Sequence, residues 1–164
     1  MRTHIRFSVS ILAAVCSLNA QADWESSLLP NDFAHQNSLK KAVAEAKRTD
    51  KHVILYYTRT NCPPCEVLQR ELRSEPTASL YRDRYVFTAV WGSSMGETER
   101  KHYRGRYNVQ GAPTWLVFTN EGEYLCTAQG GFRSSTGAKQ LQEAAQNLLK
   151  AEGSRGSEVA RSCT

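Results

Sequence analysis

The sequence predicts one α/β domain with a central four-stranded mixed β-sheet flanked by helices. Three observations lead to this expectation. Short apolar segments rich in β-branched and aromatic residues alternate with longer amphipathic segments. The last two apolar segments are separated by a short turn, which is typical of a hairpin. The length of 164 residues favours a single domain.

A helix and a buried strand are expected first, over residues 38–49 and 52–58. Ser38 is a good helix cap, and apolar residues then recur at helical spacing. These residues are Leu39, Ala42, Val43 and Ala46. The run HVILYYT at 52–58 is nearly continuous in apolar residues, which is typical of a strand covered on both faces.

A Cys-Pro-Pro-Cys sequence at 62–65 follows this strand and leads into the next helix. Residues 66–72 have helical spacing. Pro76 ends that helix or begins a second one that reaches about Arg84. The second strand is expected at 85–91, where the sequence reads YVFTAVW.

The second half of the domain adds a helix, a hairpin and a last helix. A Gly/Ser loop at 92–96 precedes a polar helix expected at 97–107. Strands at 115–119 and 124–129 flank a short turn and are expected to pair antiparallel. Strands that are joined through helices are expected to lie parallel. The amphipathic helix expected at 135–150 would bury Leu141, Ala145, Leu148 and Leu149.

Residues 1–22 have the layout of a secretory signal peptide. A short basic region is followed by an apolar run at 7–18 and by a small-residue cleavage site at 20–22. The apolar run is too short to span a bilayer. We therefore expect export to the periplasm or an equivalent space. An uncleaved anchor and a disordered tail are the alternatives.

The rest of the chain is expected to form a domain at 23–150 and a flexible tail at 151–164. Loss of Arg2 and Arg6 would lower the formal net charge of +5 by two. No Lys/Arg stripe interleaved with aromatic residues indicates a nucleic-acid partner. No later apolar stretch has membrane length, so we expect a mature form that does not span a membrane and is a monomer.

The pair Cys62 and Cys65 is the strongest functional signal. Two residues three apart at a helix start lie close enough for a disulfide. Cys62 is the predicted nucleophile, because free N–H groups and the helix dipole stabilise a thiolate at a helix N-terminus. Cys65 is predicted to resolve the mixed disulfide formed at Cys62. Pro63 and Pro64 stiffen the loop, and Pro64 suits the first helical turn.

Two other interpretations of the cysteine pair stay open. A structural disulfide that closes so short a loop would stabilise the fold little. Half of a zinc site would need further ligands, but there is no second CxxC sequence, and His35, His52 and His102 are scattered. No metal, nucleotide or flavin cofactor is implied, because the dithiol is itself the redox group.

On these motifs, residues 38–150 resemble the thioredoxin superfamily, in particular its exported bacterial members. The match rests on HVILYYT leading into CPPC, on a Gly-Ala-Pro-Thr sequence that begins at Gly111, and on the closing hairpin and helix. The resemblance implies a thioredoxin fold. It also implies that Pro113 is cis and faces the cysteine pair. Ala112 and Thr114 would then help to position a substrate, with Ala112 offering its backbone.

The sequence departs from the family pattern at two positions. Thioredoxins have a buried acid where this chain has Tyr56, and a tryptophan where it has Asn61. Both changes argue against fast, general thioredoxin-like reduction. Glu66 is a candidate for the missing proton transfer, and Arg59 for favouring the Cys62 thiolate. The alternatives are an exposed first-turn acid and a solvated loop charge.

Two further cysteines have an open pairing. Cys126 falls in the last expected strand, and Cys163 in the tail. Cys126 is either an inert buried residue or bridged to Cys163, which would tether the tail. An oxidising compartment would permit that bridge. Cys16 would be lost with the signal peptide.

Together these features predict a thiol–disulfide oxidoreductase that acts through Cys62 and Cys65. Its expected partners are exported proteins and a redox partner, each joined through transient mixed disulfides. Similar small exported domains favour a reductase or a maturation factor. The alternative is a thioredoxin-fold module that serves in docking or metal delivery.

Overall fold

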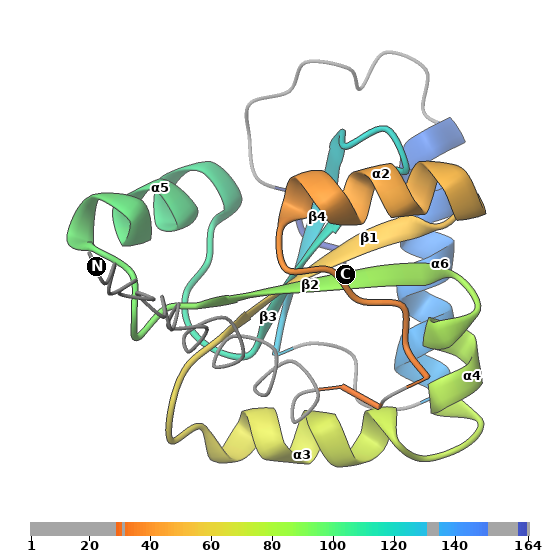
Figure 1. Ribbon diagram of the computed structural model, residues 1–164, viewed down its shortest axis with the longest axis horizontal. Helices are drawn as coiled ribbons and strands as arrows, with labels where there is room; N and C mark the ends of the chain where they lie inside the picture. Colours follow the sequence, from red (N-terminus) through yellow and green to blue (C-terminus); the bar gives the residue numbers. More distant parts are fainter. Residues whose placement is uncertain (1–28, 31, 131–134, 151–160, 164) are drawn as a thin grey trace, which may run out of the picture.

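The computed structural model describes residues 29–30, 32–130, 135–150 and 161–163. A four-stranded sheet forms the middle layer, and helices cover both of its faces (Figure 1). The predicted signal peptide at 1–22 and most of the predicted tail lie outside the described residues. No helix within the described ranges is long and apolar enough to cross a membrane.

The elements follow the predicted order, and their bounds agree to within a few residues. They are α2 (Leu39–Thr49), β1 (His52–Thr58), α3 (Pro63–Leu72), α4 (Thr77–Arg82), β2 (Tyr85–Trp91), α5 (Glu97–Tyr107), β3 (Thr114–Phe118), β4 (Tyr124–Gln129) and α6 (Ser135–Lys150). Of the four side chains expected to be buried in α6, Leu141 is buried and the others lie outside the described side chains.

The strand order is β2-β1-β3-β4. β1 and β2 are parallel, as expected for strands joined through helices. The same expectation is wrong for β3, which follows α5 but runs antiparallel to β1. α5 lies beyond the end of the sheet and has no fully buried residue, so the chain returns to β1 without a crossover over a face (Figure 1).

The pleat of β1 divides the core into two clusters, because successive side chains point to opposite faces. Ile54 and Tyr56 pack in the cluster that includes residues of α3, α4 and α6. Val53 and Leu55 pack in the cluster that includes residues of α2. The first cluster also contains the Cys62–Cys65 pair, so the redox motif is attached to the larger part of the core.

Short segments near the two chain ends cover both outer strands. On β2, Gln36 N donates to Phe87 O and Phe87 N donates to Ala34 O, each at 2.8 Å. On β4, Thr127 N donates to Arg161 O at 2.7 Å. Residues 161–163 of the predicted tail are therefore held against the sheet.

A disulfide between Cys126 and Cys163 fixes this second contact. Their Cα atoms lie 5.2 Å apart, and both residues are almost completely buried. The sequence left open whether Cys126 is an inert buried residue or is bridged to Cys163, and the structure contains the bridge.

Candidate active site

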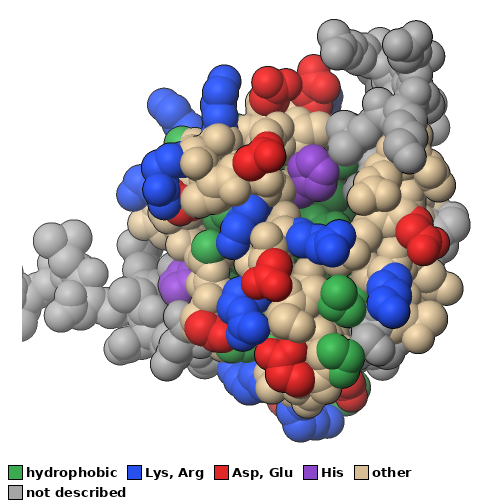
Figure 2. All heavy atoms as spheres, turned by 90° about the vertical axis from the view of Figure 1, so that its right-hand side faces the viewer, with side chains coloured by type: hydrophobic (Ala, Val, Ile, Leu, Met, Phe, Trp, Pro, Cys, Tyr) green, Lys and Arg blue, Asp and Glu red, His purple; other side chains and the backbone are tan. Residues whose placement is uncertain are grey.

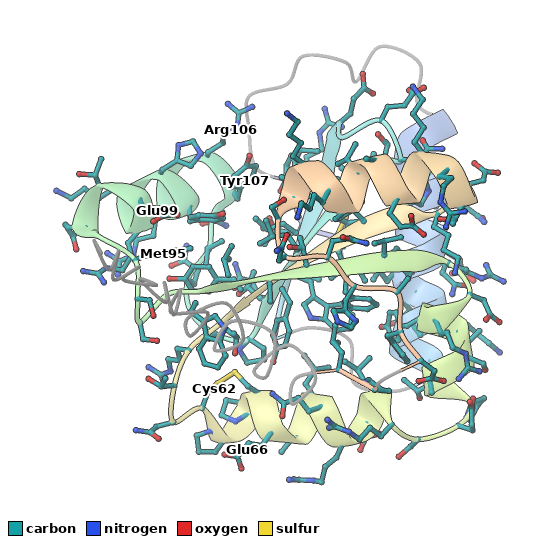
Figure 3. The ribbon with its side chains drawn as sticks, viewed as in Figure 1. Cys62, Glu66, Met95, Glu99, Arg106 and Tyr107 are labelled. Atoms are coloured by element: carbon teal, nitrogen blue, oxygen red, sulfur yellow. A yellow bond between two sulfur atoms is a disulfide. The ribbon has the colours of Figure 1, made fainter. Side chains whose placement is uncertain are left out.

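The Cys62–Cys65 disulfide lies where the loop after β1 enters α3 (Figure 3). Cys62 is the N-cap residue of α3, and the two Cα atoms are 5.2 Å apart. Cys62 is 4% exposed and Cys65 2%. The position of Cys62 at the helix start therefore distinguishes the two sulfurs more clearly than their exposure does.

The two prolines reduce the number of backbone N–H groups that this helix start can direct at a thiolate. Pro63 and Pro64 are the first two residues of α3, and neither has an N–H group. The next N–H groups belong to Cys65 and Glu66, and both donate to Cys62 O, at 2.9 and 3.2 Å. The helix N-terminus thus has fewer free donors than usual.

Asn61 has a backbone function that sequence reasoning missed. Its φ angle is 53°, in the left-handed region that asparagine tolerates better than most residues. A tryptophan, the family residue at this position, would be strained there. The identity of Asn61 thus agrees with the local turn that leads into Cys62.

The Gly-Ala-Pro-Thr loop packs against the same buried cluster. The Ala112–Pro113 peptide bond is cis, as the resemblance implies. Ala112 is half-buried against the cluster that contains both cysteines. Thr114 donates from its Oγ1 to Gly111 O at 2.6 Å, which closes the loop on itself. Thr114 therefore contributes to the shape of the loop.

The candidates for proton transfer and pKa tuning, Glu66 and Arg59, differ in position from Tyr56, which stands where the family has a buried acid. Tyr56 is completely buried, and burial raises its pKa to about 12. Tyr56 is therefore protonated near neutral pH and cannot accept a proton there. Glu66 is exposed on the outer side of α3 (Figure 3), and Arg59 is exposed in the loop. In the described structure no side-chain hydrogen bond or ion pair joins Glu66 or Arg59 to the cysteines.

A polar cavity of about 180 Å³ lies elsewhere, at the start of β1 and β2. Its lining includes Asp50, His52 and Arg84. Burial lowers the pKa of His52, although the Asp50 carboxylate opposes this shift.

On the face shown in Figure 2, basic and acidic side chains are interspersed. Within the described ranges, no three His, Cys, Asp or Glu side chains are grouped closely enough to hold a metal ion.

A disulfide at a helix start and a cis-proline loop, both on a mixed four-stranded sheet, define the class of thioredoxin-fold proteins with a CxxC pair. The family model described as a thioredoxin-like domain matches residues 39–145. The chain therefore belongs to the thioredoxin-like family. No curated protein sequence matches it significantly.

Several solved structures are similar to this chain, two of which follow. A thioredoxin from Thermus thermophilus is 18% identical, with a TM-score of 0.52 over 74% of this chain and 91% of that one. A disulphide isomerase from Xylella fastidiosa Temecula1 is 23% identical, with a TM-score of 0.49 over 68% of this chain and 86% of that one. At 18% identity, the similarity to the thioredoxin shows the fold alone.

Proposed function

We propose that the protein is a thiol–disulfide oxidoreductase of an exported compartment, acting as a reductase or maturation factor for exported proteins. The observation that carries this proposal is the Cys62–Cys65 disulfide at the start of α3, and the cis Ala112–Pro113 bond supports it. The thioredoxin-like family supports the chemistry. The predicted signal peptide supports the compartment, and the second disulfide is compatible with it, because disulfides persist where conditions are oxidising.

The reaction begins with the reduced pair. The Cys62 thiolate attacks a substrate disulfide, forms a mixed disulfide and expels one substrate thiolate. The Cys65 thiolate then attacks Cys62 Sγ, which releases the second substrate thiolate and restores the Cys62–Cys65 disulfide. Two electrons pass from the dithiol to the substrate, and the two thiol protons pass to the released thiolates. A dithiol partner returns the pair to the reduced form.

The loop at 111–114 would position the substrate chain. Ala112 packs against the large core cluster that includes both cysteines, and it would present its backbone to an extended segment that carries the substrate disulfide. The hydrogen bond from Thr114 to Gly111 O would keep the loop in shape during this contact.

Trapping of mixed disulfides tests the proposal. The Cys65→Ser variant keeps the nucleophile but cannot release a bound partner from within the molecule, so covalent adducts should accumulate in the exported compartment. The adducts should disappear with reductant and in the Cys62→Ser, Cys65→Ser double variant. No adducts from a folded and exported Cys65→Ser protein would contradict catalysis and favour docking or metal delivery.

A further inference from the structure

Three buried polar atoms without a hydrogen-bond partner gather on the sheet face that α3 covers. They are the Tyr56 hydroxyl, Thr58 Oγ1 and Trp115 Nε1. Tyr56 and Thr58 are two residues apart on β1 and therefore share a face, and Trp115 is the cross-strand neighbour of Tyr56. Each residue is at most 1% exposed. The other such atoms in the described structure belong to His52, at the far end of β1, and to Thr88, on the opposite face.

Gln69 connects this group with the redox pair. Gln69 follows Cys65 by one helical turn, so the two residues are neighbours on the same side of α3. The Gln69 side chain, like that of Thr58, lies close enough to the Tyr56 hydroxyl to lower the pKa of Tyr56. Burial outweighs both effects and raises that pKa to about 12. Tyr56 is thus a hydrogen-bond donor rather than a base at the pH values where thiols exchange.

A buried polar atom without a partner costs free energy, so several at one place require an explanation. While the disulfide is closed, Cys65 has neither a proton to lose nor a charge to stabilise. Once it opens, Cys65 is a buried thiol that must ionise before it attacks Cys62, and burial opposes this ionisation. The Tyr56 hydroxyl, which has no hydrogen-bond partner in the oxidised protein, is available for this charge.

We infer that Tyr56 and Gln69 donate hydrogen bonds to the Cys65 thiolate when Cys65 resolves a mixed disulfide. This inference rests on the proposed function and adds the groups that make its second step faster. Tyr56 keeps its own proton throughout. The Cys65 proton still passes to the thiolate that leaves with the substrate.

The other titratable groups near Cys65 do not offer this function. Tyr81 of α4 and Tyr85 of β2 belong to the same buried cluster, and burial raises the pKa of each. Tyr85 also lines the polar cavity at the start of β1 and β2, away from the cysteines. Glu66 and Arg59 are exposed. Tyr85 therefore offers a matched control, with the same chemical change in the same cluster but at the other end of the sheet.

Titration of Cys65 in the absence of Cys62 tests the inference. The full chain carries Cys16→Ser and Cys62→Ser, so that Cys65 is the one free thiol while Cys126 and Cys163 stay paired. The ¹³Cβ chemical shift of labelled cysteine is followed against pH. Tyr56→Phe, Gln69→Leu and Tyr85→Phe are then compared in this background.

Tyr56→Phe and Gln69→Leu should each raise the pKa of Cys65 by about one unit, which is a tenfold loss of thiolate at a given pH. Tyr85→Phe should leave it unchanged. The inference is overturned if neither Tyr56→Phe nor Gln69→Leu moves the titration, or if Tyr85→Phe moves it equally. If Tyr56→Phe does not fold, Gln69→Leu alone decides. The trapping experiment tests the proposed function separately, because this titration needs neither Cys62 nor a substrate.

Discussion

Replacement of Pro64 by alanine should make Cys62 a stronger acid. The side chain of an N-cap residue accepts hydrogen bonds from the N–H groups of the second and third helical residues. Here the second residue is Pro64, which has no N–H, and the N–H of the third, Cys65, already donates to Cys62 O at 2.9 Å. Pro64→Ala would supply the first free donor at this position.

The size of the effect follows from this one added bond. A hydrogen bond to a charged group contributes about 1.5 kcal/mol or more, and one pKa unit corresponds to about 1.4 kcal/mol. We therefore expect the pKa of Cys62 to fall by about one unit. Since the thiolate belongs to the reduced form, the reduction potential should rise by up to about 30 mV at a pH above that pKa.

The rate of alkylation of Cys62 against pH measures this change, with Cys65→Ser in every variant so that Cys62 alone reacts at the site. Pro63→Ala is the matched control, because it adds an N–H at the first helical position, which does not reach the N-cap side chain. The reasoning fails if both substitutions lower the pKa equally, or if Pro64→Ala leaves it unchanged.

Three other predictions concern stability. Replacing both Cys126 and Cys163 by serine should lower the free energy of unfolding by about 4 kcal/mol in the chain-entropy model, because their bridge spans 37 residues. Denaturant unfolding measures this loss, and a free energy of unfolding equal to that of the parent protein would contradict the prediction. Gly92→Ala would place its Cβ 2.2 Å from Tyr57 Oη, so the tyrosine ring must move. Thermal unfolding should then show a stability lower by about 1–3 kcal/mol. An unchanged unfolding midpoint would show that the Tyr57 ring moves at no cost. Burial lowers the pKa of His52, so the unfolded chain binds that proton more readily and stability should fall as the pH drops below about 6.5. His52→Gln should weaken this pH dependence, and an identical dependence would show that His52 does not cause it.

Local sequence patterns were sufficient to predict the helices and strands and to identify the Cys62–Cys65 redox pair. The apolar run before Cys62 and the proline-rich helix start predicted β1 and α3, because strand burial and helix capping depend on neighbouring residues. The direction of β3 was predicted wrongly. It depends on α5 lying beyond the sheet end, and a polar helix carries the same local pattern in either arrangement.

The features that the sequence did not predict depend on contacts between residues far apart in the chain. The sequence could not decide between a free Cys126 and a bridge to Cys163, because the choice depends on the tail returning to β4. It named Tyr56 as a departure from the family, but it missed the neighbouring Gln69. A helical spacing of four from Cys65 was the available signal for Gln69. The partner across the strand–helix interface becomes visible only once β1 and α3 are packed together.

The segment at 161–163 has a practical consequence for any shortened form of the chain. A protein that stops at residue 160 would lose the main-chain cover of Thr127 and leave Cys126 without its partner. It would then present an open strand edge and a free thiol side by side. Such a protein would have two independent routes to self-association, strand pairing and intermolecular crosslinking, and neither would reflect the behaviour of the intact molecule.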